Sequence, residues 1–299
     1  MKKRESSNPF ELPGRWYKAA LHTHTSSSDG ALRPDEAAEL YRSRGYDVLA
    51  LTDHERSNDI RGLSGPGFLV INGIELHPLY PGHKCRNHHI VALGVPHGYP
   101  LSRAAQKDVR ACIQQIEELG GIAILAHPPG VSVRPNSFGD MSGLAAFEVW
   151  ASHQEAMDLA CDREGAWAAG LEAGVNLPAV ATDDAHARSE VGTAWTWLKM
   201  RSLSKRSVLA AIRTGACYCS TGPKIKDFRV TADAVELRCS SCEVITFAGP
   251  GGKKAVRRAP KAGRGITGHA IARPGWSFVR AVVTDRAGRK AWTNPESLV

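Results

Sequence analysis

The sequence predicts an α/β fold followed by a small antiparallel β domain. Between residues 19 and 182, short apolar runs have the length of strands, and several are separated by segments with helical periodicity. Strands that helices cover on both faces appear as such continuous apolar runs. After about residue 220 the pattern alternates, which is typical of antiparallel sheet. A chain of 299 residues suits one barrel and an appendage. We therefore expect an N-terminal tail over 1–15, a barrel over 16–219 and a β-sandwich-like domain over 220–299.

The first predicted strand, 19–21, leads into His22-Thr23-His24 and, five residues later, Asp29 in a Ser/Gly turn. Because side chains in a strand alternate between faces, His22 and His24 point to the same side. Two imidazoles and a carboxylate at this spacing form a chelating arrangement for a divalent cation. A helix is expected over 33–44, since it has Pro at its start, acids in its first turn and Gly beyond its end.

Two further strands end in side chains of the same kind. They are 47–52, which ends at Asp53 and His54, and 68–74, which ends at Glu75. Prolines and a glycine between residues 76 and 87 disfavour a crossover helix, so the next strand, 89–94, should run antiparallel to its predecessor. This orientation places His89, at a strand start, beside residues that lie at strand ends.

The remaining elements of the first domain repeat the pattern. They are a helix over 104–119, a strand over 121–126, a strand over 145–150, a helix over 153–173 and a strand over 177–182. His127 follows the first of these strands, and Asp184 and His186 follow the last. Structural histidines scattered through a chain would not fall at strand ends so regularly. In parallel α/β proteins this rim is where ligands bind and chemistry occurs.

The C-terminal part combines short alternating segments with a strong positive charge. We expect strands over 227–230, 234–238, 243–247, 277–284 and 290–292. The formal charge of the chain is +8, yet residues 251–290 hold eleven Lys or Arg and one acid, Asp285. Such a segment suits nucleic acid or a solvated loop. Nucleic acid is disfavoured because no aromatic residues are interleaved through 253–264.

Cysteine use and hydropathy favour a cytoplasmic protein. The seven cysteines are scattered and include no repeated pair with zinc spacing, so reduced thiols are expected. The basic N-terminus is not followed by an apolar segment, which disfavours a secretory signal. No stretch approaches the roughly 18 apolar residues of a membrane helix, and no membrane partner is expected. No feature of the sequence indicates an oligomeric state.

The motifs of the first domain, taken in order, resemble those of the PHP (polymerase and histidinol phosphatase) metallohydrolases. The tail further resembles the branch named for a bacterial carbaryl hydrolase, through Ser220-Thr221-Gly222-Pro223 and the terminal 291–295. The PHP resemblance covers about residues 16–190. Its motifs are His22-Thr23-His24, Asp29-Gly30, Thr52-Asp53-His54, Gly73-Ile74-Glu75, His89-Ile90, Ala126-His127-Pro128 and Asp184-Ala185-His186.

The resemblance implies a distorted seven-stranded (β/α)7 barrel holding two or three divalent ions, Mn, Fe or Zn. One ion would bind His22, His24, Glu75 and Asp184, a second Asp29, His54 and His186, and a third Glu75, His89 and His127. Two adjacent pairs leave a choice. His89 is favoured over His88 because it precedes Ile90, and Asp184 over Asp183 because of its spacing to His186. Asp53 is expected to orient a ligand without binding metal itself.

The implied activity is hydrolysis of phosphate esters of small molecules or nucleotides by a metal-bridging hydroxide. An anionic substrate needs cationic or polar partners near the rim. The candidates are Lys84, Arg86, Arg134, His153 and Arg188. The same metal site could hydrolyse carbamate, ester or amide bonds, and a non-catalytic binding module is a further alternative. Glu148, in the middle of a strand, is expected to be structural, and His77 to be a loop residue.

Overall fold

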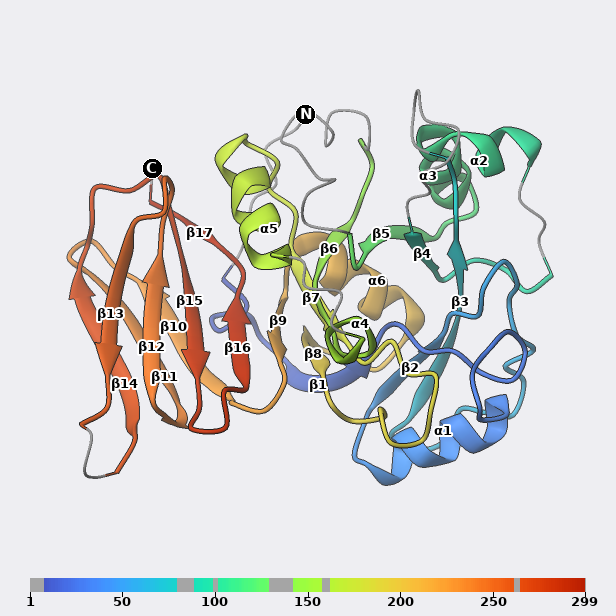
Figure 1. Cartoon of the computed structure of the whole chain (residues 1–299), viewed down its shortest axis with the longest axis horizontal. Helices are drawn as coiled ribbons and strands as arrows, with labels where there is room; N and C mark the ends of the chain where they lie inside the picture. Colours follow the sequence, from blue (N-terminus) through green and yellow to red (C-terminus); the bar gives the residue numbers. More distant parts are fainter. Residues whose placement is uncertain are drawn as a thin grey trace.

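All seven strands predicted for the first domain form, and they lie next to one another in chain order. The computed structural model describes residues 8–79, 89–98, 102–128, 142–157, 162–260 and 264–298. The sheet order is β1-β2-β3-β4-β5-β6-β7, with strands at the right of Figure 1. Their bounds are Arg15–Ala20, Val48–Leu51, Leu69–Leu76, His89–Leu93, Ile122–Ala126, Ala146–Ala151 and Ala179–Thr182.

The fourth strand runs antiparallel to both neighbours, as predicted. β4 pairs antiparallel with β3 and with β5, whereas β1, β2 and β3 are parallel, and so are β5, β6 and β7. In this register His89 lies opposite Ala126. The start of β4 therefore meets the end of β5, where His127 follows.

The two ends of the seven-strand run meet through one parallel bridge, between Thr23 after β1 and Ala185 after β7. In the described ranges they share no further ladder, because the free edge of β1 is taken by antiparallel β8 (Trp195–Met200). β7 approaches β8 through a side chain, with Ala181 N donating to Thr196 Oγ1 at 3.0 Å. The fold is thus a mixed α/β sheet of barrel type, and the closed barrel stays a prediction.

The helices follow the predicted positions, but two of them are broken. α1 (Pro34–Ser43) forms as expected. The helix predicted over 104–119 is split into α2 (Arg103–Lys107) and α3 (Val109–Glu118), because Asp108 is extended and its carboxylate accepts from two amides of α3. The long helix predicted over 153–173 is wrong as a single element. It is replaced by α4 (Ser152–Ala156) and α5 (Arg163–Glu172), and the Asp162 carboxylate caps α5.

Three elements were not predicted in the segment between the two domains. They are β8, α6 (Lys205–Thr214) and β9 (Cys217–Ser220). β9 pairs with β8 on one side and with β16 (Lys290–Thr293) on the other. One sheet therefore continues from the α/β part into the C-terminal part, and the boundary at 219/220 stays a prediction.

The C-terminal part is an antiparallel β structure of two sheets (left in Figure 1). One sheet contains β10 (Ile225–Val230), β11 (Ala234–Cys242) and β14 (Ile266–Ala272). The other continues from β16 through β15 (Phe278–Thr284) and β12 (Val244–Ala248) to β13 (Lys254–Arg258), and β17 (Glu296–Ser297) pairs with β15. Buried residues that include Phe228, Phe247 and Val283 form a common core.

The basic segment that begins at Lys253 is a strand of this domain. β13 pairs with β12, and its Lys254, Arg257 and Arg258 side chains are exposed. No helix in the described part of the chain is long and apolar enough to cross a lipid bilayer.

Candidate metal centre

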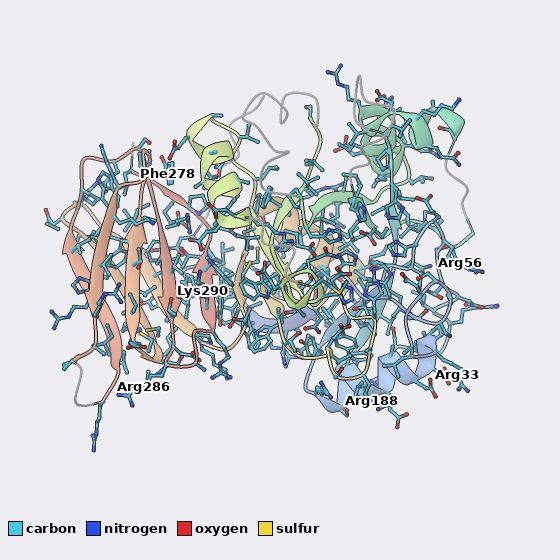
Figure 2. All side chains as sticks on the ribbon, in the orientation of Figure 1. Arg33, Arg56, Arg188, Phe278, Arg286 and Lys290 are labelled. Carbon is cyan, nitrogen blue, oxygen red and sulfur yellow. The ribbon has the colours of Figure 1, made fainter. Side chains whose placement is uncertain are left out.

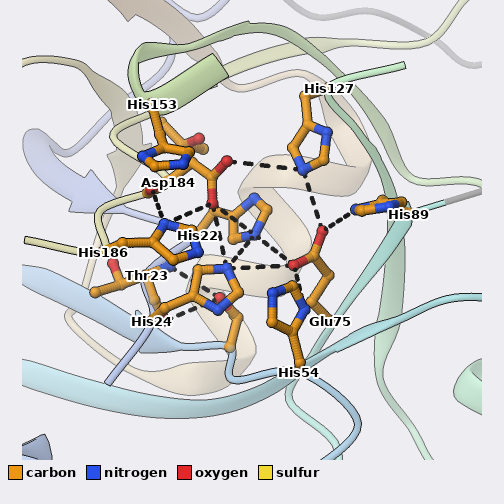
Figure 3. A network of polar contacts seen from close by, with 12 residues as sticks. His22, Thr23, His24, His54, Glu75, His89, His127, His153, Asp184 and His186 are labelled. Atoms are coloured by element: carbon orange, nitrogen blue, oxygen red, sulfur yellow. Dashed lines mark hydrogen bonds and ion pairs between the residues drawn. The ribbon is translucent and has the colours of Figure 1, made fainter. Parts of the chain in front are cut away.

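The predicted metal ligands gather in one cluster, although they come from six different strand ends. His22 and His24 follow β1, His54 follows β2 and His127 follows β5. Glu75 lies near the end of β3, His89 begins β4, and Asp184 and His186 follow β7. Their side chains point toward one another (Figure 3).

Four buried donors surround one point at the bottom of the cluster. The Nε2 atoms of His22 and His24 lie 3.1 Å apart. Each nitrogen also lies 3.2–3.3 Å from Glu75 Oε2 and from Asp184 Oδ1. Donors spaced in this way on a tetrahedron would each lie about 2 Å from its centre, which is the length of zinc–nitrogen and zinc–oxygen bonds.

A second group lies nearer to solvent. Asp29 Oδ2 is 3.3 Å from His54 Nε2 and 3.5 Å from His186 Nε2. The side chain of Asp29 is 52% exposed, whereas that of His54 is 30% exposed. His24 Nδ1 lies 3.5 Å from Asp29 Oδ1, so this imidazole faces both groups.

Glu75 joins the groups because its two oxygens face different donors. Oε2 faces His22 and His24 and lies 3.0 Å from His54 Nδ1. Oε1 accepts at 2.8 Å from His89 Nδ1 and at 3.1 Å from His127 Nε2. A carboxylate that is buried with an imidazole on every side has the surroundings of a ligand shared between cations.

Two buried atoms of the cluster lack a hydrogen bond of good geometry. They are Asp184 Oδ1 and His54 Nδ1. A buried polar atom without a partner destabilises a protein by about 1–3 kcal/mol, so such atoms need an explanation. A cation bound between His22, His24, Glu75 and Asp184 would satisfy Asp184 Oδ1. Among the described residues no cysteine belongs to the cluster, which disfavours a purely structural zinc site.

The pKa shifts of Glu75 and His22 also favour a bound cation. Burial opposes the charge on Glu75, but His22 and His127 outweigh it and hold the pKa of Glu75 well below its usual range. Burial likewise opposes a charge on His22, but the carboxylates of Asp184 and Glu75 raise its pKa well above the usual value. The ionised carboxylates therefore attract positive charge, either as protons on the imidazoles or as metal ions that displace them. The donor set fits divalent cations.

Comparison with known proteins shows what this chain is similar to. Residues 168–217 match the family model described as PHP-associated. A solved two-domain protein from Bacteroides vulgatus, described as containing a "predicted PHP-like metal-dependent phosphoesterase", superposes with a TM-score of 0.54. The match covers 92% of this chain and 93% of that one at 17% identity, so it shows a common two-domain fold.

The chain is similar to PHP proteins over part of its length. Among curated relatives, the 3′,5′-nucleoside bisphosphate phosphatase of Chromobacterium violaceum is 33% identical over 94 residues, which are 30% of this chain and 32% of that protein. The 5′-3′ exoribonuclease of Haemophilus influenzae is 29% identical over 140 residues, 46% of this chain and 48% of that protein. The chain thus spans about a third to a half of the length of these relatives. The assignment to the carbaryl-hydrolase branch stays a prediction.

Asp53 lies behind the candidate metal centre and fixes the loop that carries His24 and Asp29. Its Oδ1 accepts from Thr25 N at 2.8 Å and from Ser28 Oγ at 2.6 Å, and its Oδ2 accepts from Thr25 Oγ1 at 2.7 Å. Asn58 donates to the same carboxylate. The buried Asp53 therefore holds the turn between His24 and Asp29.

Asp183 and Asp184 face opposite ways. Asp184 is directed into the cluster and has a positive φ of 52°, which is rare outside glycine. Asp183 accepts hydrogen bonds from Thr193 N at 2.8 Å, Ala194 N at 2.7 Å and Tyr41 Oη at 2.9 Å. It therefore fixes the loop after His186, away from the cations that the cluster would hold.

Glu148 is closer to the metal centre than the sequence suggested. Its Oε1 lies 3.2 Å from His22 Nδ1 and accepts from Thr182 Oγ1 at 2.6 Å. Its Oε2 accepts from the backbone N of His127 at 2.6 Å. Such a carboxylate fixes the ring orientation of a ligating histidine and raises its basicity. The only signal in the sequence was an acid in an otherwise apolar strand.

Two further residues contact histidines of the cluster. His77, expected in a surface loop, has its ring centre 4.4 Å from that of His89 and 4.9 Å from that of His54. It contacts Glu55 Oε1 at 2.8 Å. Glu190, which sequence reasoning missed, contacts His153 Nδ1 at 2.8 Å and accepts from His186 N at 2.7 Å.

Only two of the five predicted substrate-binding residues lie among the described residues. His153 lies beside the cluster, with its ring stacked 4.2 Å from His186. Arg188 is exposed on the loop after β7 (Figure 2). Lys84, Arg86 and Arg134 lie outside the described residues, as does His88.

Proposed function

We propose that this PHP protein is a metal-dependent hydrolase that cleaves phosphate esters. The observation that carries the proposal is the position of Glu75, whose two oxygens face separate groups of imidazoles. A carboxylate shared in this way supports cations held close together, as phosphate-ester hydrolysis requires. The names of the phosphatase and exoribonuclease relatives support the same class.

The ligand sets follow the donor groups. We assign one ion to His22, His24, Glu75 and Asp184, a second to Asp29, His54 and His186, and a third to Glu75, His89 and His127. Mn, Fe or Zn suits these donors. When bound, such ions lower the pKa of a water molecule and neutralise charge on the phosphate oxygens. The ligands would be held by a distorted barrel closed at the Thr23–Ala185 bridge.

The remaining residues position these ligands and the substrate. Asp53 would keep His24 and Asp29 at the distance that the ions need, and Glu148 would keep the Nε2 of His22 directed inward. His153, held through Nδ1 by Glu190, leaves its Nε2 for an oxygen of the substrate phosphate. Nucleotides are the favoured substrates, since one relative is named for a nucleoside bisphosphate and the other for the removal of nucleotides from RNA. Free thiols at the described cysteines support a cytoplasmic location.

The test is a comparison of substrates on protein stripped of metal and reloaded with Mn²⁺, Fe²⁺ or Zn²⁺. We would measure product release from a nitrophenyl phosphate, a nucleoside 3′,5′-bisphosphate and a nitrophenyl carbamate. The His22→Ala/His24→Ala protein is the blank, and His97→Ala, an exposed histidine outside the cluster, is the matched control.

Phosphate release that requires metal and is lost only in the double variant would support the proposal. Turnover of the carbamate alone would reassign the same site to carbonyl chemistry. If the metal-loaded protein turned over none of the substrates, both the phosphate-ester hypothesis and the carbonyl-hydrolysis hypothesis would be contradicted.

A further inference from the structure

A polar cavity lies in the C-terminal β structure, away from the described residues that form the candidate metal centre. It has a volume of about 630 Å³ and lies where the end of β11, the start of β14 and the turn between β15 and β16 meet. Arg286, on that turn, is labelled in Figure 2. The polar residues that line it are Ser241, Arg264, Thr267, Asp285, Arg286 and Arg289.

The cavity has an excess of positive charge. Three guanidinium groups, Arg264, Arg286 and Arg289, line it together with one carboxylate. That carboxylate, Asp285, is engaged within its own turn: Oδ2 accepts from Arg289 Nε at 2.8 Å, and Oδ1 accepts from the backbone N of Ala287 and of Arg289. Three positive charges against one negative charge leave an excess of two. A cavity of this kind favours an anion with several oxygens.

The backbone packs closely beside the cavity at two glycines. The β11–β14 ladder shifts register between Arg238 and Cys242, so the chain bulges at this point. A Cβ at Gly265 would lie 2.5 Å from Ser241 Oγ and 2.6 Å from Cys242 O, so no larger residue fits there. A Cβ at Gly222 would lie 2.7 Å from Arg289 Nε. Gly222 therefore lets the Arg289 guanidinium lie against the chain, where Asp285 holds it.

We propose that this cavity, lined by Arg264, Arg286 and Arg289, binds a phosphate group. Guanidinium groups pair with two phosphate oxygens at once, and hydroxyls such as those of Ser241 and Thr267 donate to the others. The phosphate belongs either to a mononucleotide or to the backbone of a single RNA strand, since both present the same oxygens. The proposal is independent of the metal-dependent activity, because the two sites share no residue.

The experiment uses the full chain stripped of metal with EDTA, which removes phosphate binding through the metal centre. Binding of a fluorescein-labelled ten-nucleotide single-stranded RNA is followed by anisotropy at low and moderate salt. Inorganic phosphate and AMP serve as competitors. The test variant is Arg264→Gln/Arg286→Gln. The control is Arg257→Gln/Arg258→Gln, which removes the same charge from exposed β13 outside the cavity.

We expect the test variant to bind the RNA at least about tenfold more weakly, and the control to change by less than about twofold. If AMP and RNA bind equally well, the cavity recognises a single phosphate group. If RNA binds much more tightly than AMP, the cavity recognises the backbone of the RNA strand. The proposal fails if the wild-type protein binds none of the probes or if the test variant binds RNA as tightly as the wild type. It also fails if the control variant loses as much affinity for RNA as the test variant. Thermal melting of both variants establishes that they are folded.

Discussion

At the scale of single residues, Glu75 organises the metal centre because five imidazoles face its two oxygens. Glu75→Gln keeps the size of the side chain but replaces one oxygen by an amide nitrogen that cannot bind a cation. We expect the variant to retain at least one divalent ion fewer per chain, measured by elemental analysis after dialysis. Glu236→Gln, an exposed acid in β11, is the matched control. Full metal content in Glu75→Gln would contradict the shared-ligand assignment.

Substitution of Glu148 tests whether residues that contact the ligands, without binding metal themselves, affect metal affinity. Glu148→Gln should weaken metal binding about 10–100-fold, because His22 loses the carboxylate that orients its ring. The measurement is a competition titration of the stripped protein against a chromophoric chelator, with near-UV circular dichroism to check the fold. A merely structural role would lower the melting temperature without changing metal affinity, and Glu148→Asp should restore part of the affinity.

The predicted ligands that lie in the cluster share one property. His54, His127 and His186 follow buried strands within four residues, so the strand pattern places them at the rim. Glu148 and Glu190 had no such signal, since one is an isolated acid within a strand and the other lies in a loop. Their roles depend on contacts between segments far apart in the chain, such as His22 with Glu148.

At the scale of elements, the loop after β1 depends on a carboxylate from the loop after β2. Asp53 is fully buried and accepts hydrogen bonds from Thr25, Ser28 and Asn58. Asp53→Ala leaves these donors without a partner, so we expect a loss of about 3 kcal/mol in the free energy of unfolding of the metal-free protein, measured with urea. Asp59→Ala is the control and should change little, since its ion pair with Arg61 is on the surface. Equal effects would show that the loop is held by other contacts.

The broken helices illustrate why element boundaries were harder to predict than element positions. The apolar spacing over 104–119 continues through Asp108, so periodicity alone gives one helix. Asp108 adopts an extended conformation instead and caps α3. Competition between helix periodicity and capping by Asp is decided by how the flanking turns pack, which the sequence pattern does not contain.

At the scale of the whole molecule, a continuous sheet links the candidate metal centre to the C-terminal β structure. The sequence indicated a change of character near residue 220, but β9 pairs with strands of both parts. The alternation of apolar and polar residues defines each strand, whereas the pairing of strands distant in sequence is set by the tertiary fold. This difference is why β8, β9 and α6 were missed while the flanking elements were predicted.

The two ends of the described chain meet at a buried acid, which makes stability depend on pH. Burial, assisted by the nearby Glu11, raises the pKa of Glu296 to about 7. The folded state therefore holds this proton more tightly than the unfolded state, and its stability falls as pH rises from the unfolded pKa of 4.5 through about 7.

Glu296→Gln should remove that loss. We expect the variant to be more stable than the wild type at pH 8, by up to about 3 kcal/mol, and close to it at pH 5. Urea unfolding of the metal-free proteins at both pH values measures the difference. An equal difference at pH 5 and pH 8 would show that Glu296 does not titrate in this range.

Anomalous diffraction measures most directly whether the strand-end residues hold divalent cations. Crystals of protein loaded with Mn²⁺ or Zn²⁺ would be measured on both sides of the metal absorption edge. We expect a peak among His22, His24, Glu75 and Asp184, at about 2.0–2.2 Å from each donor atom, and at least one further peak that shares Glu75 as a ligand. A map without a peak among these donors, from protein that has bound metal elsewhere, would contradict this expectation.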